Sequence, residues 1–212
     1  MRSSISKSLS DIASYYSDKL AEHADTSLGV DWNSEESQRI RFAQLCKVID
    51  HKISNFSINV LGCGYGALLN YMRDQGSECS YLGIDISDTM IKSSKIRHAN
   101  DNNARFLVSD EPDEVADYGL ASGIFNVRLE RKDSEWFDYL QASLDILDKT
   151  SSRGFAFNCL TSYSDIDKRH EYLYYSDPCC LFELCKQRYS RQVALLHDYG
   201  LYEFTILVRK NV

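Results

Sequence analysis

The chain has 212 residues, enough for one domain with a sizeable hydrophobic core. Its 31 acidic and 24 basic side chains give a net charge of -7, which argues against a polyanionic partner, so we expect no nucleic acid as substrate. No apolar run approaches the length of a membrane span, and Met1 to Ser10 lack the apolar centre of a secretory signal, so we expect no membrane association. Seven scattered cysteines without a C-x-x-C pair indicate thiols in a reducing cytoplasm and no metal site.

The first 50 residues are expected to form a helical arm. Apolar and aromatic residues recur at helical spacing between residues 7 and 23. After a polar break, Ser34 is placed to cap a second helix over residues 35–49. Such an arm can cover a binding cleft or pack against a sheet, and the sequence leaves both possibilities open.

Residues 51–212 alternate between strand and helix. Gly76 is expected to end the first helix of this part, Ser87 or Asp88 to cap the second, and Ser134 to open the third. The predicted strands cover 58–61, 81–85, 104–108, 120–125 and 154–160, where 120–125 includes the exit of the fourth strand, which ends at Ser122 and Gly123. The helices between them cover 66–75, 88–98 and 135–147. This alternation predicts an α/β fold, a doubly wound and mostly parallel sheet with helices on both faces.

The end of the chain follows a different pattern. Asp177-Pro178 begins a helix that reaches Tyr189, with the proline in its first turn. Two strands follow, at 192–198 and 202–209, with only three residues between them. Strands joined so tightly must be antiparallel, because a parallel return needs a long crossover. A C-terminal antiparallel hairpin is therefore expected at one edge of the sheet.

A glycine-rich turn, Gly62-Cys63-Gly64-Tyr65-Gly66, follows the first buried strand. Glycines let the backbone turn tightly and let a ligand approach it, and the next helix presents N–H groups there. Two cofactor classes use such a turn. Gly62, Gly64 and Ala67 satisfy the dinucleotide fingerprint G-x-G-x-x-G/A, whereas G-C-G-x-G is the form favoured by enzymes that use S-adenosylmethionine. The glycines alone do not choose between these cofactors.

This turn and the terminal hairpin are the features by which the chain resembles the class I S-adenosylmethionine-dependent methyltransferases, and the resemblance covers about residues 34–210. The resemblance implies a Rossmann-like methyltransferase fold with a seven-stranded sheet. It also implies one methyltransferase domain over residues 1–212, with an arm or lid at 1–50 and a core at 51–212. A two-half dinucleotide dehydrogenase would need a second βαβ half and a longer chain, so a NAD-dependent oxidoreductase is the less favoured alternative.

The resemblance implies where the cofactor binds. The backbone of Gly62, Cys63 and Gly64 would meet its amino-acid end. Asp85 ends the second predicted strand, where its carboxylate would accept hydrogen bonds from both ribose hydroxyls, although it could instead cap the next helix. The remaining expected contacts are Ile86 and Met90 with the adenine ring, Ser109 and Asp110 with the adenine amino group, and Ser122 and Gly123 with the methionine end.

The sequence departs from the family pattern at Val60, where the family usually has an acidic residue that helps to order the cofactor's ammonium group. Either the affinity is lower or the partner of the ammonium lies elsewhere in the chain. Arg41 and Trp32 of the arm could also reach the cofactor. Because of Val60, and because no base is assured, a non-catalytic partner subunit that binds S-adenosylmethionine is the alternative to an enzyme.

Methyl transfer from a sulfonium is an in-line displacement, in which the protein mainly aligns the acceptor and excludes water. A base is needed only where the acceptor must lose a proton. His197, beside Asp198, is the candidate catalytic residue, with His170 and His23 as alternatives; a packed or surface histidine is the simpler interpretation. Tyrosines near the C-terminus could form an aromatic wall around the acceptor: Tyr172, Tyr174, Tyr175 and Tyr199.

The acceptor class is constrained by what the chain lacks. Residues 122–126 read Ser-Gly-Ile-Phe-Asn, not the Asn-Pro-Pro-Tyr type of motif that accompanies methylation of amino groups on nucleic-acid bases. This absence and the negative charge favour a small-molecule substrate, such as a sugar or a natural-product intermediate.

Overall fold

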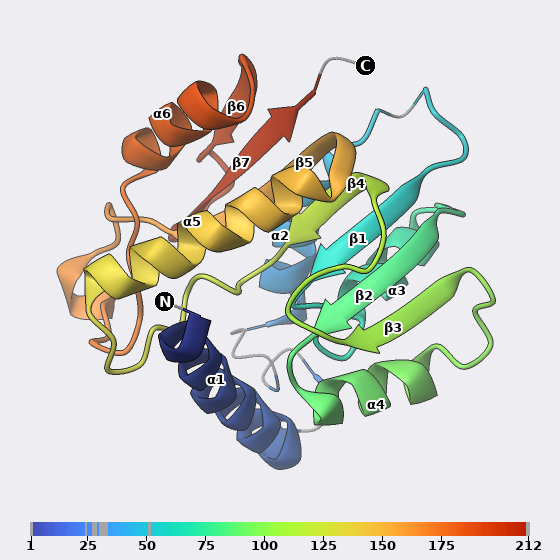
Figure 1. Cartoon of the computed structure of the whole chain (residues 1–212), viewed down its shortest axis with the longest axis horizontal. Coiled ribbons are helices and arrows are strands. Elements are labelled where there is room, and N and C mark those ends of the chain that lie inside the picture. Colours follow the sequence, from blue (N-terminus) through green and yellow to red (C-terminus); the bar gives the residue numbers. More distant parts are fainter. Residues whose placement is uncertain (1, 24, 27–28, 30–33, 51, 211–212) are drawn as a thin grey trace.

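The computed structural model describes residues 2–23, 25–26, 29, 34–50 and 52–210. Its core is a seven-stranded sheet in the order β3-β2-β1-β4-β5-β7-β6 (Figure 1). The pairs from β3 to β5 are parallel, and β7 is antiparallel to both of its neighbours. The predicted Rossmann-like fold and its C-terminal hairpin are therefore confirmed.

The strands are β1 (Ser57–Leu61), β2 (Ser80–Asp85), β3 (Ala104–Val108), β4 (Ala116–Ala121), β5 (Ser151–Leu160), β6 (Gln192–Leu196) and β7 (Glu203–Arg209). The helices are α1 (Arg2–His23), α2 (Glu35–Cys46), α3 (Ala67–Asp74), α4 (Asp88–Arg97), α5 (Asp133–Lys149) and α6 (Pro178–Arg188), with a short 3-10 helix η2 (Ile166–Lys168).

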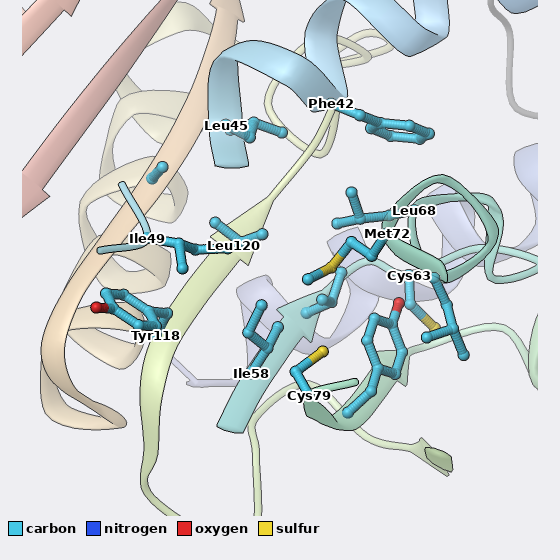
Figure 2. Close-up of a cluster of buried hydrophobic side chains, with 14 of the residues drawn as sticks. Phe42, Leu45, Ile49, Ile58, Cys63, Leu68, Met72, Cys79, Tyr118 and Leu120 are labelled. Atoms are coloured by element: carbon cyan, nitrogen blue, oxygen red, sulfur yellow. The ribbon is translucent and has the colours of Figure 1, made fainter. Parts of the chain in front are cut away.

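Apolar side chains fill the space on both faces of the sheet, because successive residues of a strand point to opposite faces. In β1, Val60 belongs to the layer beneath α2 and α3, and Leu61 belongs to the layer beneath α5 and α6. Figure 2 shows the first layer, in which Phe42 and Leu45 of α2 point toward Leu68 of α3 and the strands below. Complete burial of a side chain such as Leu45 stabilises the fold by about 1.5–3 kcal/mol.

Two predicted helix caps are confirmed, and a third cap is found where a helix was predicted to begin. Ser34 Oγ accepts a hydrogen bond from Ser37 N–H, 3.1 Å, at the start of α2. Ser87 Oγ accepts one from Met90 N–H, 3.2 Å, at the start of α4. Asp177 caps α6 through the N–H groups of its first turn, with Pro178 in that turn as expected.

Several predicted boundaries were wrong. The fourth strand was expected to start at Leu120, but it begins at Ala116; it ends at Ala121, directly before the exit expected at Ser122 and Gly123. Its first half was missed because Asp117 is polar; the carboxylate of Asp117 bonds to Ser57 N–H, 2.8 Å, and to Arg153 Nε, 2.9 Å. Ser134 does not open α5, which starts one residue earlier without a side-chain cap among the described residues. The other differences of two or more residues lie at the starts of α1, β5 and α5 and at the ends of α2, α5 and β6.

The N-terminal arm both packs against the sheet and covers a cleft, the two possibilities that the sequence left open. Helix α2 packs against β5, β7 and α3, whereas α1 crosses the carboxyl ends of the strands beside α4 (Figure 1). Leu20 of α1 packs with Tyr65 and Met90, and Ser17 Oγ lies 2.9 Å from Ser87 Oγ. These contacts hold α1 above the glycine turn.

Within the part of the chain that the structure describes, no helix combines the length and the apolar character needed to span a bilayer.

Candidate functional site

A cavity lies at the carboxyl ends of β1, β2 and β4, beneath α1. It contains about 1200 Å³ of empty space, part of which opens to solvent. The cofactor contacts expected in the glycine turn and at the ends of the strands all line this cavity: Gly62, Cys63, Gly64, Asp85, Ile86, Met90, Ser109, Asp110, Ser122 and Gly123. The fold thus brings these residues together from four separate segments of the chain.

The glycine turn needs its glycines for steric reasons of its own. The φ angles of Gly62, Gly64 and Gly66 are 69°, 54° and 86°, in the left-handed region that residues with a Cβ atom rarely adopt. A Cβ atom at Gly62 would lie 2.1 Å from Cγ2 of Ile124, and one at Gly66 would lie 2.7 Å from Nε2 of His98. Substitution would therefore distort the turn.

Two N–H groups of the turn that were expected to meet the ligand are occupied within the protein. Cys63 N–H donates to the carbonyl of Ile84, 2.9 Å, and Gly64 N–H donates to Asp85 Oδ2, 2.9 Å. The turn is thereby tied to the end of β2. Helix α3 starts directly after it, without a side-chain cap among the described residues, and its first two residues, Ala67 and Leu68, line the cavity. The first N–H groups of a helix lack partners within the helix, so this end can accept an anionic ligand group.

Asp85 organises the site from the end of β2. Besides Gly64, its carboxylate accepts a hydrogen bond from Ser87 N–H, 2.9 Å. Burial raises the pKa of Asp85, and hydrogen bonds from the N–H groups of Ser87, Gly64 and Ile86 lower it in part. The cap of α4 is Ser87, not Asp85. Since a carboxylate offers about four acceptor positions, Asp85 retains capacity for a hydroxyl donor of a ligand.

The far end of the cavity holds an unsatisfied polar group. The hydroxyl of Ser122 is buried and has no hydrogen-bond partner among the described residues. A buried hydroxyl without a partner is costly, so its position fits a ligand with a polar group at this end. Ser122 is the residue predicted to line the methionine end of S-adenosylmethionine, and the arrangement fits that cofactor.

The charge of the cavity also fits a cationic sulfonium. Among the described residues that line the cavity there is no lysine, arginine or histidine, whereas Asp85 and Asp110 contribute carboxyl groups. Val60, at the position where the family usually has an acid, lines the cavity with an apolar side chain. A partner for the cofactor's ammonium group must therefore come from another group of the site.

Three helices supply lining residues that the sequence analysis missed. Ile12 and Tyr16 come from α1, and Gln38 and Phe42 from α2, while the lining residues of α5 are Tyr139, Ala142, Ser143 and Ile146. The spacing of the α5 set places these residues on one helix face, a signal that was available in the sequence. Burial raises the pKa of Tyr139 to about 12, so its hydroxyl is a neutral hydrogen-bond group at neutral pH.

Neither His197 nor His170, both considered as bases, lines the cavity. His197 lies at the same edge of the sheet, because β6 runs parallel to β5, but it is exposed. Its ring centroid is 5.9 Å from that of Tyr163 and 6.1 Å from that of Phe204. His170 is exposed beside Tyr172. The role of His197 as a base therefore stays a prediction.

Most of the other candidates from the sequence lie outside the cavity lining. Arg41 points into the protein interior, where its Nε donates to Glu203 Oε2 at 2.8 Å. Trp32 lies outside the described residues, and His23 is the last residue of α1. The tyrosines proposed as an aromatic wall do not line the cavity either: Tyr172, Tyr174, Tyr175 and Tyr199.

Comparison with known proteins gives three findings. Residues 58–144 match the family model described as a methyltransferase domain. The Mycobacterium tuberculosis (strain ATCC 25618 / H37Rv) protein named "Putative methyltransferase Rv1506c" is 59% identical over 155 residues, which are 73% of this chain and 93% of that protein. Among solved structures, the DhpI–SAH complex superposes with a TM-score of 0.67 at 16% identity, covering 95% of this chain and 96% of that one.

A second solved structure, human N-acetylserotonin methyltransferase in complex with SAM, has a TM-score of 0.58 at 17% identity. The match covers 84% of this chain and 57% of the human one. Similarity to solved structures at these identities shows the fold.

Proposed function

This chain belongs to the class I S-adenosylmethionine-dependent methyltransferases, and we propose that it transfers the methyl group to a small-molecule acceptor. The observation that carries the proposal is the cover over the cavity. Ile12 and Tyr16 of α1, with Gln38 and Phe42 of α2, line the cavity beside the glycine turn, so that an acceptor next to the cofactor lies against two helices. A cavity bordered in this way accommodates a metabolite better than a nucleic acid, and the net charge of -7 argues in the same direction.

The residues that hold the cofactor are proposed from the geometry of the cavity. When bound, S-adenosylmethionine supplies a methyl group on a positively charged sulfur. Asp85 accepts hydrogen bonds from the ribose hydroxyls, Ile86 and Met90 pack against the adenine, and Ser109 and Asp110 lie beside its amino group. At the other end, Ser122 bonds to the amino-acid part, together with the start of α3. The glycine turn gives the backbone the shape on which these contacts depend.

The chain's own contribution to catalysis is alignment and exclusion of water. The apolar residues Ile12, Phe42 and Ile124 line the cavity, and apolar walls beside the reacting groups reduce the competition of water with the acceptor. The raised pKa of Tyr139 makes its hydroxyl a hydrogen-bond donor at neutral pH, and not a base. His197 stays a candidate base for an acceptor that extends from the cavity to the end of β6.

A solved neighbour gives limited support for the acceptor class. The human protein is named for a small molecule, N-acetylserotonin, and its chain superposes on 84% of this one. We also propose that residues 1–212 act as one domain, because α2 packs against β5 and β7 and α1 contacts α4. The free thiols of its cysteines suit a reducing compartment such as the cytoplasm.

The proposal is tested with S-adenosylmethionine carrying an isotope-labelled methyl group. The purified chain is incubated with pools of small metabolites and, separately, with DNA, RNA and protein extracts, and the label is followed by mass spectrometry. Label in a small molecule supports the proposal, and label only in nucleic acid or protein contradicts it. Cofactor binding without any transfer, with activity restored by a second protein, would instead support the non-catalytic partner subunit.

A further inference from the structure

A buried ion pair lies next to the cavity and has no part in the account given above. Arg41 Nε and Glu203 Oε2 are 2.8 Å apart, and the two side chains are only 8% and 2% exposed. Moving two charges out of water costs several kcal/mol per ion, and apolar replacements of similar size are often at least as stable. The pair therefore calls for an explanation other than stability.

Glu203 gathers donors from three different segments. Arg41 of α2 and Asn158 of β5 both donate to Oε2, at 2.8 and 2.6 Å. Asn126, in the segment after β4, donates a hydrogen bond from its amide N–H to Glu203 Oε1 at 3.4 Å. Glu203 itself is the first residue of β7. One carboxylate thus connects the arm with the exits of two central strands.

The two asparagines pass this connection on to the backbone. Because their amide nitrogens bond to Glu203, their amide oxygens must face the other way. Asn158 Oδ1 accepts a hydrogen bond from Gly123 N–H at 2.8 Å, and Asn126 Oδ1 accepts one from Leu160 N–H at 3.2 Å. Gly123 stands between Ser122 and Ile124, and all three line the cavity. We call residues 122–124 the strand-exit wall.

Arg41 connects Glu203 to the part of α2 that lines the cavity. It lies in α2 one turn after Gln38 and directly before Phe42, and both of these neighbours line the cavity. We call Gln38 and Phe42 the α2 wall. Arg41 is held by Glu203 on the inner side of this wall.

We infer that Glu203 is a positioning residue that sets the distance between the α2 wall and the strand-exit wall of the cofactor cavity. It acts through Arg41 on one wall and through Asn158 on the other, and it does not itself line the cavity. The inference rests on the proposed function in one respect, that S-adenosylmethionine occupies this cavity. Binding groups that are held at fixed positions by buried neighbours lose affinity when those neighbours are changed.

The test compares Glu203→Gln with Asp117→Asn as a matched control. Asp117 also joins an arginine to a backbone N–H group, through Arg153 Nε at 2.9 Å and Ser57 N–H at 2.8 Å. It lies near the start of β4, at the opposite edge of the sheet from the cavity. Thermal unfolding gives the stability of each variant, and calorimetry at a temperature where both are folded gives the dissociation constant for S-adenosylmethionine.

Both substitutions should lower Tm, but only Glu203→Gln should weaken S-adenosylmethionine binding, by about tenfold, with a change below about twofold for Asp117→Asn. The double variant Arg41→Met/Glu203→Gln removes both charges and should regain Tm while binding stays weak, because the uncharged side chain at position 41 no longer holds the α2 wall. Affinity of Glu203→Gln or of the double variant within about twofold of the unchanged protein would overturn the inference. A protein that binds S-adenosylmethionine normally but methylates no small molecule would contradict only the proposed function.

Discussion

The carboxyl edge of the sheet has two halves that are built differently. At β1 and β2, the site is made by the backbone and by one carboxylate. The glycines of the turn have φ angles in the left-handed region, and the Asp85 carboxylate links the turn to the start of α4. At β5 and β7, it is held by buried side chains from distant segments, as in the pair of Arg41 and Glu203, which are 162 residues apart. We propose that the first half determines the cofactor class and that the second half sets the shape of the cavity.

The strongest test of the first half is Gly62→Ala. The new Cβ atom would lie 2.1 Å from Cγ2 of Ile124 at a φ of 69°, so either the turn or the strand-exit wall must move. We expect S-adenosylmethionine binding to weaken by more than about a hundredfold, measured by calorimetry.

Gly200→Ala is the matched control for this change. Gly200 has a φ of 75°, but among the described residues other than its two chain neighbours no atom lies within 4 Å of the position of its Cβ. It should therefore lose about 1 kcal/mol of stability through backbone strain and keep its cofactor affinity. Equal loss of affinity in both variants would show that strain, and not the cavity, explains the effect at Gly62.

Asp85→Ala should have the next largest effect. It removes charge-assisted hydrogen bonds to the ligand and the acceptor for Gly64 N–H, so we expect the binding free energy to fall by about 1.5–3 kcal/mol. Calorimetric titration with S-adenosylmethionine measures this loss. Unchanged affinity would remove Asp85 from the site.

The pH dependence of binding gives a second test of Asp85. Because its pKa is raised, the folded protein takes up a proton here at a higher pH than an unfolded chain does. Its contribution to folding stability is therefore complete below the ordinary pKa of Asp and is lost as the pH rises through the raised value. Cofactor affinity should change in the opposite direction and fall as the pH is lowered, because the protonated group loses acceptor capacity. Dissociation constants measured from neutral pH down toward the ordinary pKa of Asp, about 4, should show this slope, and Asp85→Asn should abolish it.

Tyr16→Ala tests the cover that α1 places over both halves. Tyr16 lines the cavity, whereas its neighbour Tyr15 does not, although the two rings are in contact with centroids 5.3 Å apart. We expect Tyr16→Ala to raise the KM for S-adenosylmethionine by about fivefold, and Tyr15→Ala to change it by less than about twofold. Similar effects in both variants would mean that α1 acts only through its overall stability.

The smallest effect is expected at His197. Its imidazole is exposed and lies outside the cavity, near Tyr163. For an acceptor confined to the cavity, His197→Gln should change kcat by less than about twofold at any pH. Loss of the acidic limb of the pH–rate profile, where a base becomes protonated, would instead establish His197 as the base, and would show that the acceptor reaches the end of β6.

The contrast between the half of the site at β1 and β2 and the half at β5 and β7 also explains what could be predicted from the sequence. The glycine turn, Asp85 and the caps at Ser34 and Ser87 depend on residues a few positions apart, so their spacing indicated their structure. The bonds of Glu203 with Asn158 and Arg41 depend on strand order and helix packing, which no local pattern contains.

The missed start of the fourth strand has a similar cause. Polar Asp117 belongs to β4 because it pairs with Ser57 and Arg153. Long-range pairing, not hydrophobicity, decides the boundary here. The lining face of α5 was visible as a helical period, but only the fold shows that it faces the cavity.

The most direct test of the account is a crystal structure of the protein with S-adenosylhomocysteine. We predict that both ribose hydroxyls lie within hydrogen-bond distance of the Asp85 carboxylate and that the hydroxyl of Ser122 gains a partner at the other end of the ligand. A nucleoside bound elsewhere, with Asp85 in contact with none of it, would contradict the assignment of this cavity as the cofactor site.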